Sequence, residues 1–191
     1  LDACWFATLK DTYGRPYNYK VTAVDNAPGV LQTVGNMVWS FDDVHTVKLS
    51  QQDMIWCHDT LHYLRSPLDA LFNWHGLLNE DGILIVEVPI QHNILGGTYH
   101  DYSMGRLIIQ LASAGFDCRG GHFQYDKANG WLRAAVYKTV DAPRMYKSWY
   151  ELQETNRLPQ CLDAILYAND YFNESDLVLE WIDRSQSFLS L

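Results

Sequence analysis

Short apolar runs alternate with segments of helical periodicity along most of this chain. Three of the runs, at residues 20–24, 54–57 and 83–88, are apolar at nearly every position, which is typical of strands buried on both faces. Between the last two runs, Ser66 and Pro67 favour the start of a helix, as N-cap and first helical residue. Apolar residues then follow at helical spacing, at Leu68, Leu71, Trp74, Leu77 and Leu78. This order of elements predicts a mostly parallel sheet with helices on both faces, a doubly wound α/β fold.

The pattern changes after the third run. A helix is predicted over residues 104–114, and Gly115 follows its last turn. Two further apolar runs, at residues 122–125 and 132–137, flank the turn-rich residues 126–130. We therefore expect an antiparallel hairpin that closes the otherwise parallel sheet. The apolar face of the predicted helix is formed by Leu107, Ile108 and Leu111.

Beyond residue 140 the periodicity is helical throughout, over roughly 146–156 and 162–189. The sequence thus predicts an α/β domain over residues 1–140 and a helical C-terminal extension over residues 141–191. The extension is rich in aromatic and aliphatic residues, which must be covered either by the sheet or by another subunit. A homodimer formed through the C-terminal helices is the expected arrangement in the second case.

The composition excludes several classes of protein. Hydrophobic residues make up 48% of the 191 residues and charged residues 19%, whereas a disordered chain is rich in charge and poor in apolar residues. The net charge of −9 repels phosphate groups, so neither nucleic acids nor anionic membranes are expected partners. The apolar runs are too short to span a bilayer, and no leader pattern opens the chain. We expect a cytoplasmic protein whose four scattered cysteines are buried thiols.

Residues 53–89 resemble the middle of the class I S-adenosylmethionine-dependent methyltransferases. The resemblance rests on D-M-I at 53–55, T-L-H-Y-L at 60–64, S-P at 66–67 and L-L-N-E-D-G at 77–82, followed by a strand that ends in proline. It extends upstream to V-T-A-V-D at 21–25 and downstream to the helix before Gly115, and so covers about residues 5–138. It implies a Rossmann-like methyltransferase fold and methyl transfer from S-adenosylmethionine, with a small molecule as the favoured acceptor.

The resemblance also implies which residues contact the cofactor. Asp25 follows the family's second strand, where an acid can accept hydrogen bonds from both ribose hydroxyls. A turn-forming aspartate is the plainer interpretation of the same residue. Asp42 and Asp43 stand where the family has an acid that binds the adenine amino group, although a solvated loop pair fits equally well. Cys57, at the end of its strand, is the fourth candidate for cofactor contact.

The N-terminus departs from the family pattern, because the glycine-rich loop that lets the backbone approach the cofactor is absent from this sequence. In one register, Leu1 and Asp2 belong to the family's first strand, and Cys4, Phe6 and Thr8 occupy the glycine positions. In the other register, residues 3–13 form the first helix. Both stay open on the sequence alone. The departure motivates an alternative function, a catalytically silent subunit of methyltransferase fold that binds a partner or serves as a scaffold.

His58 and His62 have the four-residue spacing of zinc-binding histidines on one helical face. Their surroundings match the methyltransferase segment better, so no metal is expected. His58 would lie at the carboxyl end of its strand, where the acceptor meets the methyl group. An imidazole, whose unperturbed pKa is about 6.5, suits a general base there, although a hydrogen-bonded loop histidine is an equally good interpretation. We expect His62, His100 and Tyr102 to line the substrate side.

Overall fold

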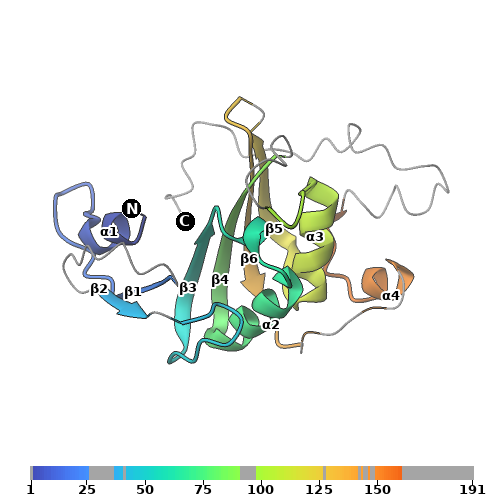
Figure 1. Cartoon of the computed structure of the whole chain (residues 1–191), viewed down its shortest axis with the longest axis horizontal. Helices are drawn as coiled ribbons and strands as arrows, with labels where there is room; N and C mark the ends of the chain where they lie inside the picture. Colours follow the sequence, from blue (N-terminus) through green and yellow to red (C-terminus); the bar gives the residue numbers. More distant parts are fainter. Residues whose placement is uncertain are drawn as a thin grey trace. The chain divides into compact units, whose positions relative to one another are not determined.

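The computed structural model describes residues 2–25, 37–40, 42–90, 98–126, 128–141, 143, 146 and 149–160. The chain divides into two compact units, residues 1–48 and residues 49–191 (Figure 1). This division falls inside the predicted α/β domain, and the predicted boundary at residue 140 stays a prediction.

The first unit contains the helix α1 (Asp2–Thr8) and two parallel strands, β1 (Val21–Val24) and β2 (Met37–Ser40). Asp25 directly follows β1, and its backbone N–H donates to the carbonyl of Ser40 at 3.2 Å. The strand predicted at residues 20–24 is therefore confirmed, and its parallel partner lies before the two acidic residues at 42 and 43.

Residues 2–8 are helical, so the register that places Leu1 and Asp2 in a strand is wrong. The alternative, a helix over residues 3–13, holds only for its first half. The helix ends because the Asp11 carboxylate accepts the backbone N–H groups of Tyr13 and Arg15, both at 2.9 Å, and so stabilises a turn instead. Gly14 takes the positive φ of 77° that this turn requires.

The second unit is built on a four-stranded sheet of β3 (Gln52–His58), β4 (Leu78–Pro89), β5 (Phe116–Asp126) and β6 (Trp131–Lys138). The strand order is β3-β4-β6-β5. β3 is parallel to β4, whereas β6 is antiparallel to both of its neighbours. The predicted closing antiparallel hairpin is thereby confirmed, and the parallel part of this mixed sheet is the pair of β3 and β4.

Two helices lie on one face of this sheet, α2 (Pro67–Leu77) and α3 (Met104–Ser113) (Figure 1). The predicted apolar stripe of α3 is fully buried, and Ser103 accepts the N–H of Arg106 at 3.2 Å as its N-cap. Gly115 follows α3 with a φ of 91°, as its place after the helix predicts. The core between helices and sheet includes Ala70, Leu71, Leu107, Ile108, Leu111, Leu84 and Val86.

Two segments rich in turn-forming residues lie within strands as bulges. β4 begins at Leu78, directly after α2, but its register with β3 passes from Gln52 and Leu78 to Met54 and Ile83, so residues 79–82 form a bulge in which Asp81 has a φ of 62°. The glycine pair at 120–121 lies within a register shift of β5, where Asp117 Oδ1 accepts the N–H groups of Arg119 and Gly120. Both strands resume their pairing beyond the bulge.

The described part of the C-terminal extension packs against its own unit. It contains α4 (Trp149–Glu154), which lies inside the predicted helix at 146–156 but is shorter. Leu152 and Leu158 are buried, and Arg157 donates to the carbonyl of Ala112 at 3.2 Å and to Asp141 at 2.7 Å. The helix predicted at 162–189 lies outside the described residues. None of the helices that the structure describes is long and apolar enough to cross a membrane.

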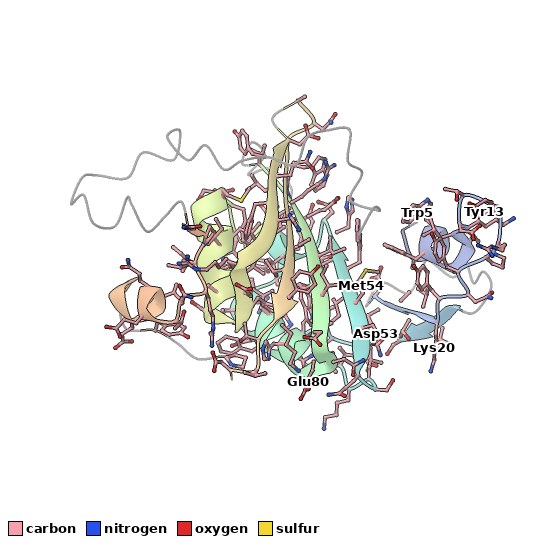
Figure 2. All side chains as sticks on the ribbon, turned by 180° about the vertical axis from the view of Figure 1, so that it is seen from behind. Trp5, Tyr13, Lys20, Asp53, Met54 and Glu80 are labelled. Carbon is pink, nitrogen blue, oxygen red and sulfur yellow. The ribbon has the colours of Figure 1, made fainter. Side chains whose placement is uncertain are left out.

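The amino and carboxyl ends of the parallel strands β3 and β4 differ in the exposure of their polar side chains. Asp53, Met54 and Glu80 lie toward the amino ends of β3 and β4 and are exposed (Figure 2). The side-chain amide of Asn79 donates to Asp53 at 2.6 Å there. The opposite edge of the sheet carries a buried polar cluster, and ligands of parallel sheets bind at that carboxyl edge.

Candidate functional site

His58, Glu87 and Arg133 meet on three adjacent strands near the carboxyl edge. The register pairs His58 of β3 with Glu87 of β4, and Glu87 with Arg133 of β6. The imidazole Nδ1 of His58 lies 2.7 Å from Glu87 Oε2, and Arg133 Nε donates to Glu87 Oε1 at 2.9 Å. The Glu87 carboxylate therefore joins an imidazole to a guanidinium, one on each oxygen.

The cluster extends to the closing hairpin. Arg133 Nη1 donates to Gln124 Oε1 at 3.1 Å and lies 3.3 Å from Asp126 Oδ2, so residues of β5 hold the guanidinium. The side chains of Glu87 and Asp126 are only 11% and 8% exposed. The network thus runs from the His58 imidazole through Glu87 and Arg133 to Asp126 at the hairpin turn, and Arg133 contacts a carboxylate on each side.

The His58 ring is held on one face as well as at one nitrogen. The ring of Trp131 stacks on it, with the centroids 5.0 Å apart and the planes inclined by 29°. An ionised carboxylate only accepts hydrogen bonds, so Nδ1 of neutral His58 carries the proton and Nε2 the lone pair. Within the described part of the chain, Nε2 makes no hydrogen bond, and the side chain is 36% exposed. This arrangement presents a proton acceptor of fixed orientation to a ligand.

Sequence reasoning found His58 but not its partners. The available signal was Glu87, the charged residue within the apolar run at 83–88. A buried strand keeps a charge only where a partner compensates it. Arg133 and Asp126 gave no comparable signal, because their place beside Glu87 follows from the pairing of β4 with β6 and of β6 with β5.

Cys57 and Tyr102 lie in the interior of the second unit. Cys57 is 5% exposed, and burial raises the pKa of its thiol to about 12 against the opposing effect of nearby backbone amides. Tyr102 is 3% exposed, its hydroxyl donates to Gln110 Oε1 at 2.9 Å, and burial raises its pKa. Neither group is an acid or base near neutral pH, so any role at the site is one of shape. Their predicted contacts with cofactor and substrate stay predictions.

His62 and His100 are brought together by the backbone. The carbonyl of His62 accepts the N–H groups of Tyr99 at 3.0 Å and of His100 at 3.2 Å. His62, in the short 3-10 helix η1 (Leu61–Tyr63), is 2% exposed; burial lowers its pKa, and Asp59 partly opposes this effect. The His100 ring is fixed between Arg106 at Nδ1, 2.9 Å away, and the carbonyl of Arg65 at Nε2, 3.3 Å away. Their predicted substrate-side role stays a prediction.

The predicted cofactor acids belong to the first unit. Asp25 directly follows β1, at the carboxyl end of that strand, and its predicted contact with the ribose hydroxyls stays a prediction. Asp42 accepts the hydroxyl of Ser40. Asp43 Oδ1 accepts the backbone N–H of His45 at 2.8 Å and lies 2.6 Å from Nδ1 of the His45 ring. The backbone hydrogen bond lowers the pKa of the Asp43 carboxyl. Asp43 thus stabilises the turn at residues 44–46, in agreement with the loop interpretation, and the adenine role of either acid stays a prediction.

Metal binding has no support among the residues that the structure describes, where no group of three His, Cys, Asp or Glu side chains is placed to hold an ion. His58 and His62 also do not share a helical face, because His58 ends β3 and His62 lies in η1.

Several solved structures with a similar fold are methyltransferases. No protein-family model matches the chain, and no curated protein sequence matches it. A Burkholderia thailandensis 1,6-didemethyltoxoflavin-N1-methyltransferase, with 1,6-didemethyltoxoflavin and S-adenosylhomocysteine bound, is 19% identical with a TM-score of 0.52. The match covers 64% of this chain and 62% of that one. The chain has the class I methyltransferase fold.

Two further methyltransferase structures show the same likeness. Human N-acetylserotonin methyltransferase, in complex with S-adenosylmethionine, is 15% identical with a TM-score of 0.53, over 65% of this chain and 42% of that chain. The N-methyltransferase NodS of Bradyrhizobium japonicum, in complex with S-adenosylhomocysteine, is 17% identical with a TM-score of 0.50, over 62% and 66%. The chain therefore spans less than two thirds of the length of each, and at these identities the likeness concerns the fold.

Proposed function

We propose that this chain is the catalytic part of an S-adenosylmethionine-dependent methyltransferase whose acceptor is a small molecule. The observation that carries the proposal is the hydrogen bond of 2.7 Å between His58 Nδ1 and Glu87, because it leaves Nε2 unprotonated at the carboxyl edge of a methyltransferase-type sheet. An acceptor that carries a proton, such as a hydroxyl or an amine, needs a base in this place.

The chain's own residues would act on the acceptor through position and proton transfer. His58 Nε2 takes the proton of the attacking hydroxyl or amine, and Glu87 stabilises the imidazolium that forms. Trp131 prevents the ring from turning away, since it stacks on one face. The donor, when bound, supplies a methyl group on a positively charged sulfur. Asp25 is the residue proposed to hold its ribose hydroxyls.

We also propose a cytoplasmic location and a homodimeric assembly for the protein. A cytoplasmic location suits an enzyme that uses S-adenosylmethionine as its methyl donor. A homodimer through the C-terminal extension would cover the apolar residues beyond 160, whereas the described residues 149–160 pack on their own unit. Light scattering of the natural protein, before and after removal of residues 161–191, tests the dimer.

Methyl transfer is tested in two steps with the natural full-length protein. Calorimetric titration with S-adenosylmethionine and with S-adenosylhomocysteine first measures donor binding. Radiolabelled S-adenosylmethionine is then incubated with the protein and a low-molecular-mass cell extract, and labelled small molecules are separated. The substitution His58→Asn keeps an N–H for Glu87 and removes the base. It should lower the initial rate of transfer by 10²- to 10⁴-fold and leave the donor affinity unchanged.

His122→Asn is the matched control, because His122 lies on β5 opposite Ala135 of β6 and does not belong to the network of His58, Glu87 and Arg133. It should transfer methyl groups at the wild-type rate. If the natural protein binds neither donor nor product, the catalytic proposal is wrong and a silent subunit of this fold is the better description. Donor binding with equal rates for wild type and His58→Asn would reject His58 as the base.

A further inference from the structure

Glu87 can orient His58 only if its own carboxylate is held in one plane. Its Oε2 faces His58 Nδ1 at 2.7 Å, and its Oε1 accepts the Arg133 Nε–H at 2.9 Å. Without the second contact, the carboxylate is free to turn about its terminal torsion, which has a broad energy minimum. Arg133 is therefore the group that fixes which oxygen the imidazole meets.

Arg133 is itself fixed by the hairpin. Its Nη1 donates to Gln124 at 3.1 Å and contacts Asp126 at 3.3 Å, while its side chain is 25% exposed. Asp126 also orders the turn, because it accepts the backbone N–H of Asn129 at 3.1 Å and the side-chain amide at 2.8 Å. The geometry of the turn is thus transmitted through two side chains to the carboxylate beside His58.

The charges around His58 come from every strand beside it. Glu87 contributes from β4, Arg133 from β6 and Asp126 from β5, and Asp59 follows His58 along the chain, 3.5 Å from the His62 ring. The single positive charge of Arg133 lies between two carboxylates. Its removal leaves the Glu87 and Asp126 carboxylates without the cation that joins them.

We propose that Arg133, held by Asp126, is a positioning residue that sets the tautomer of His58 through Glu87. The inference rests on the proposed function for its catalytic consequence, but the tautomer itself is a property of the protein without any substrate.

The test compares Arg133→Met, Arg133→Lys and Asp126→Asn with the wild type by nitrogen-15 NMR of the histidine rings, the His58 signal being assigned by its loss in His58→Asn. In the wild type, the neutral ring should be protonated at Nδ1. In Arg133→Met, the form protonated at Nε2 should appear in measurable amount, and Arg133→Lys should restore most of the wild-type signal. Asp126→Asn should give a smaller change in the direction of Arg133→Met.

Kinetics give the second measurement. Arg133→Met should lower kcat about tenfold with KM within about twofold, because the residue acts on the base and not on the acceptor. Arg133→Lys should restore most of the wild-type kcat. Urea unfolding of each variant shows whether the protein is folded at the temperature of the assay.

The two proposals fail in different ways. An unchanged His58 tautomer in folded Arg133→Met would overturn the positioning role, even if His58→Asn abolishes methyl transfer. A tautomer that shifts as expected, in a wild-type protein that transfers no methyl group, would reject the proposed function and uphold the positioning role. If Arg133→Met does not fold, the same comparison is decided with Arg133→Lys and Asp126→Asn.

Discussion

Replacement of Gly115 by alanine should be one of the most damaging single-methyl changes in the second unit. Gly115 has a φ of 91°, and a Cβ there would lie 2.8 Å from His75 Nε2 and 3.1 Å from the carbonyl oxygen of Asp141. The backbone strain costs roughly 1–2 kcal/mol. The His75 ring must move as well, and it then loses its contact of 3.2 Å with the carbonyl of Thr139, which costs about 1 kcal/mol more.

Gly130→Ala is the matched control, because Gly130 has a φ of 75° and nothing within 4 Å of the position of its Cβ. Urea unfolding, followed by fluorescence, should show Gly115→Ala less stable than wild type by about 3 kcal/mol and Gly130→Ala by about 1–2 kcal/mol. Equal losses in the two variants would mean that the backbone conformation alone determines the cost. The contact with His75 would then contribute nothing.

Three further measurements test other parts of the structure. Burial lowers the pKa of both His62 and His75, so the unfolded chain binds more protons than the folded protein below about pH 6.5. The free energy of unfolding should therefore fall as the pH drops from 7.5 to 5.5, and a free energy that does not change with pH would contradict this. Arg157→Met removes the hydrogen bonds to the Ala112 carbonyl and the Asp141 carboxylate and should cost about 1–2 kcal/mol, with faster proteolysis at residues 149–160. Asp25→Asn should weaken calorimetric binding of S-adenosylmethionine by about tenfold, and unchanged affinity would remove Asp25 from the donor site.

Local signals predicted most of the helices and strands correctly. Ser66 and Pro67 begin α2, Gly115 follows α3, and the turn-rich residues 126–130 separate two antiparallel strands. Each of these signals depends on residues within one turn of the chain, through a cap, a fixed φ or a positive φ. Such features are readable without knowledge of what packs against them.

Local signals do not show where a strand resumes after a turn-forming segment. Residues 79–82 form a bulge in β4, since the register passes from the pair Gln52 and Leu78 to the pair Met54 and Ile83. The glycines at 120–121 lie in a bulge of β5, and pairing with β6 continues on both sides of them. The neighbouring strand decides that the chain pairs again, and no short window of sequence contains that neighbour.

The candidate site divides in the same way. The sequence by itself determined that a histidine stands at the end of a buried strand and that one glutamate interrupts the next. Only the tertiary structure decided that Glu87 faces His58 and that Arg133, from a strand 46 residues further along, holds the other oxygen. The physical reason is that side-chain identity is encoded at one position, whereas the orientation of a proton-accepting nitrogen depends on the register of three strands at once.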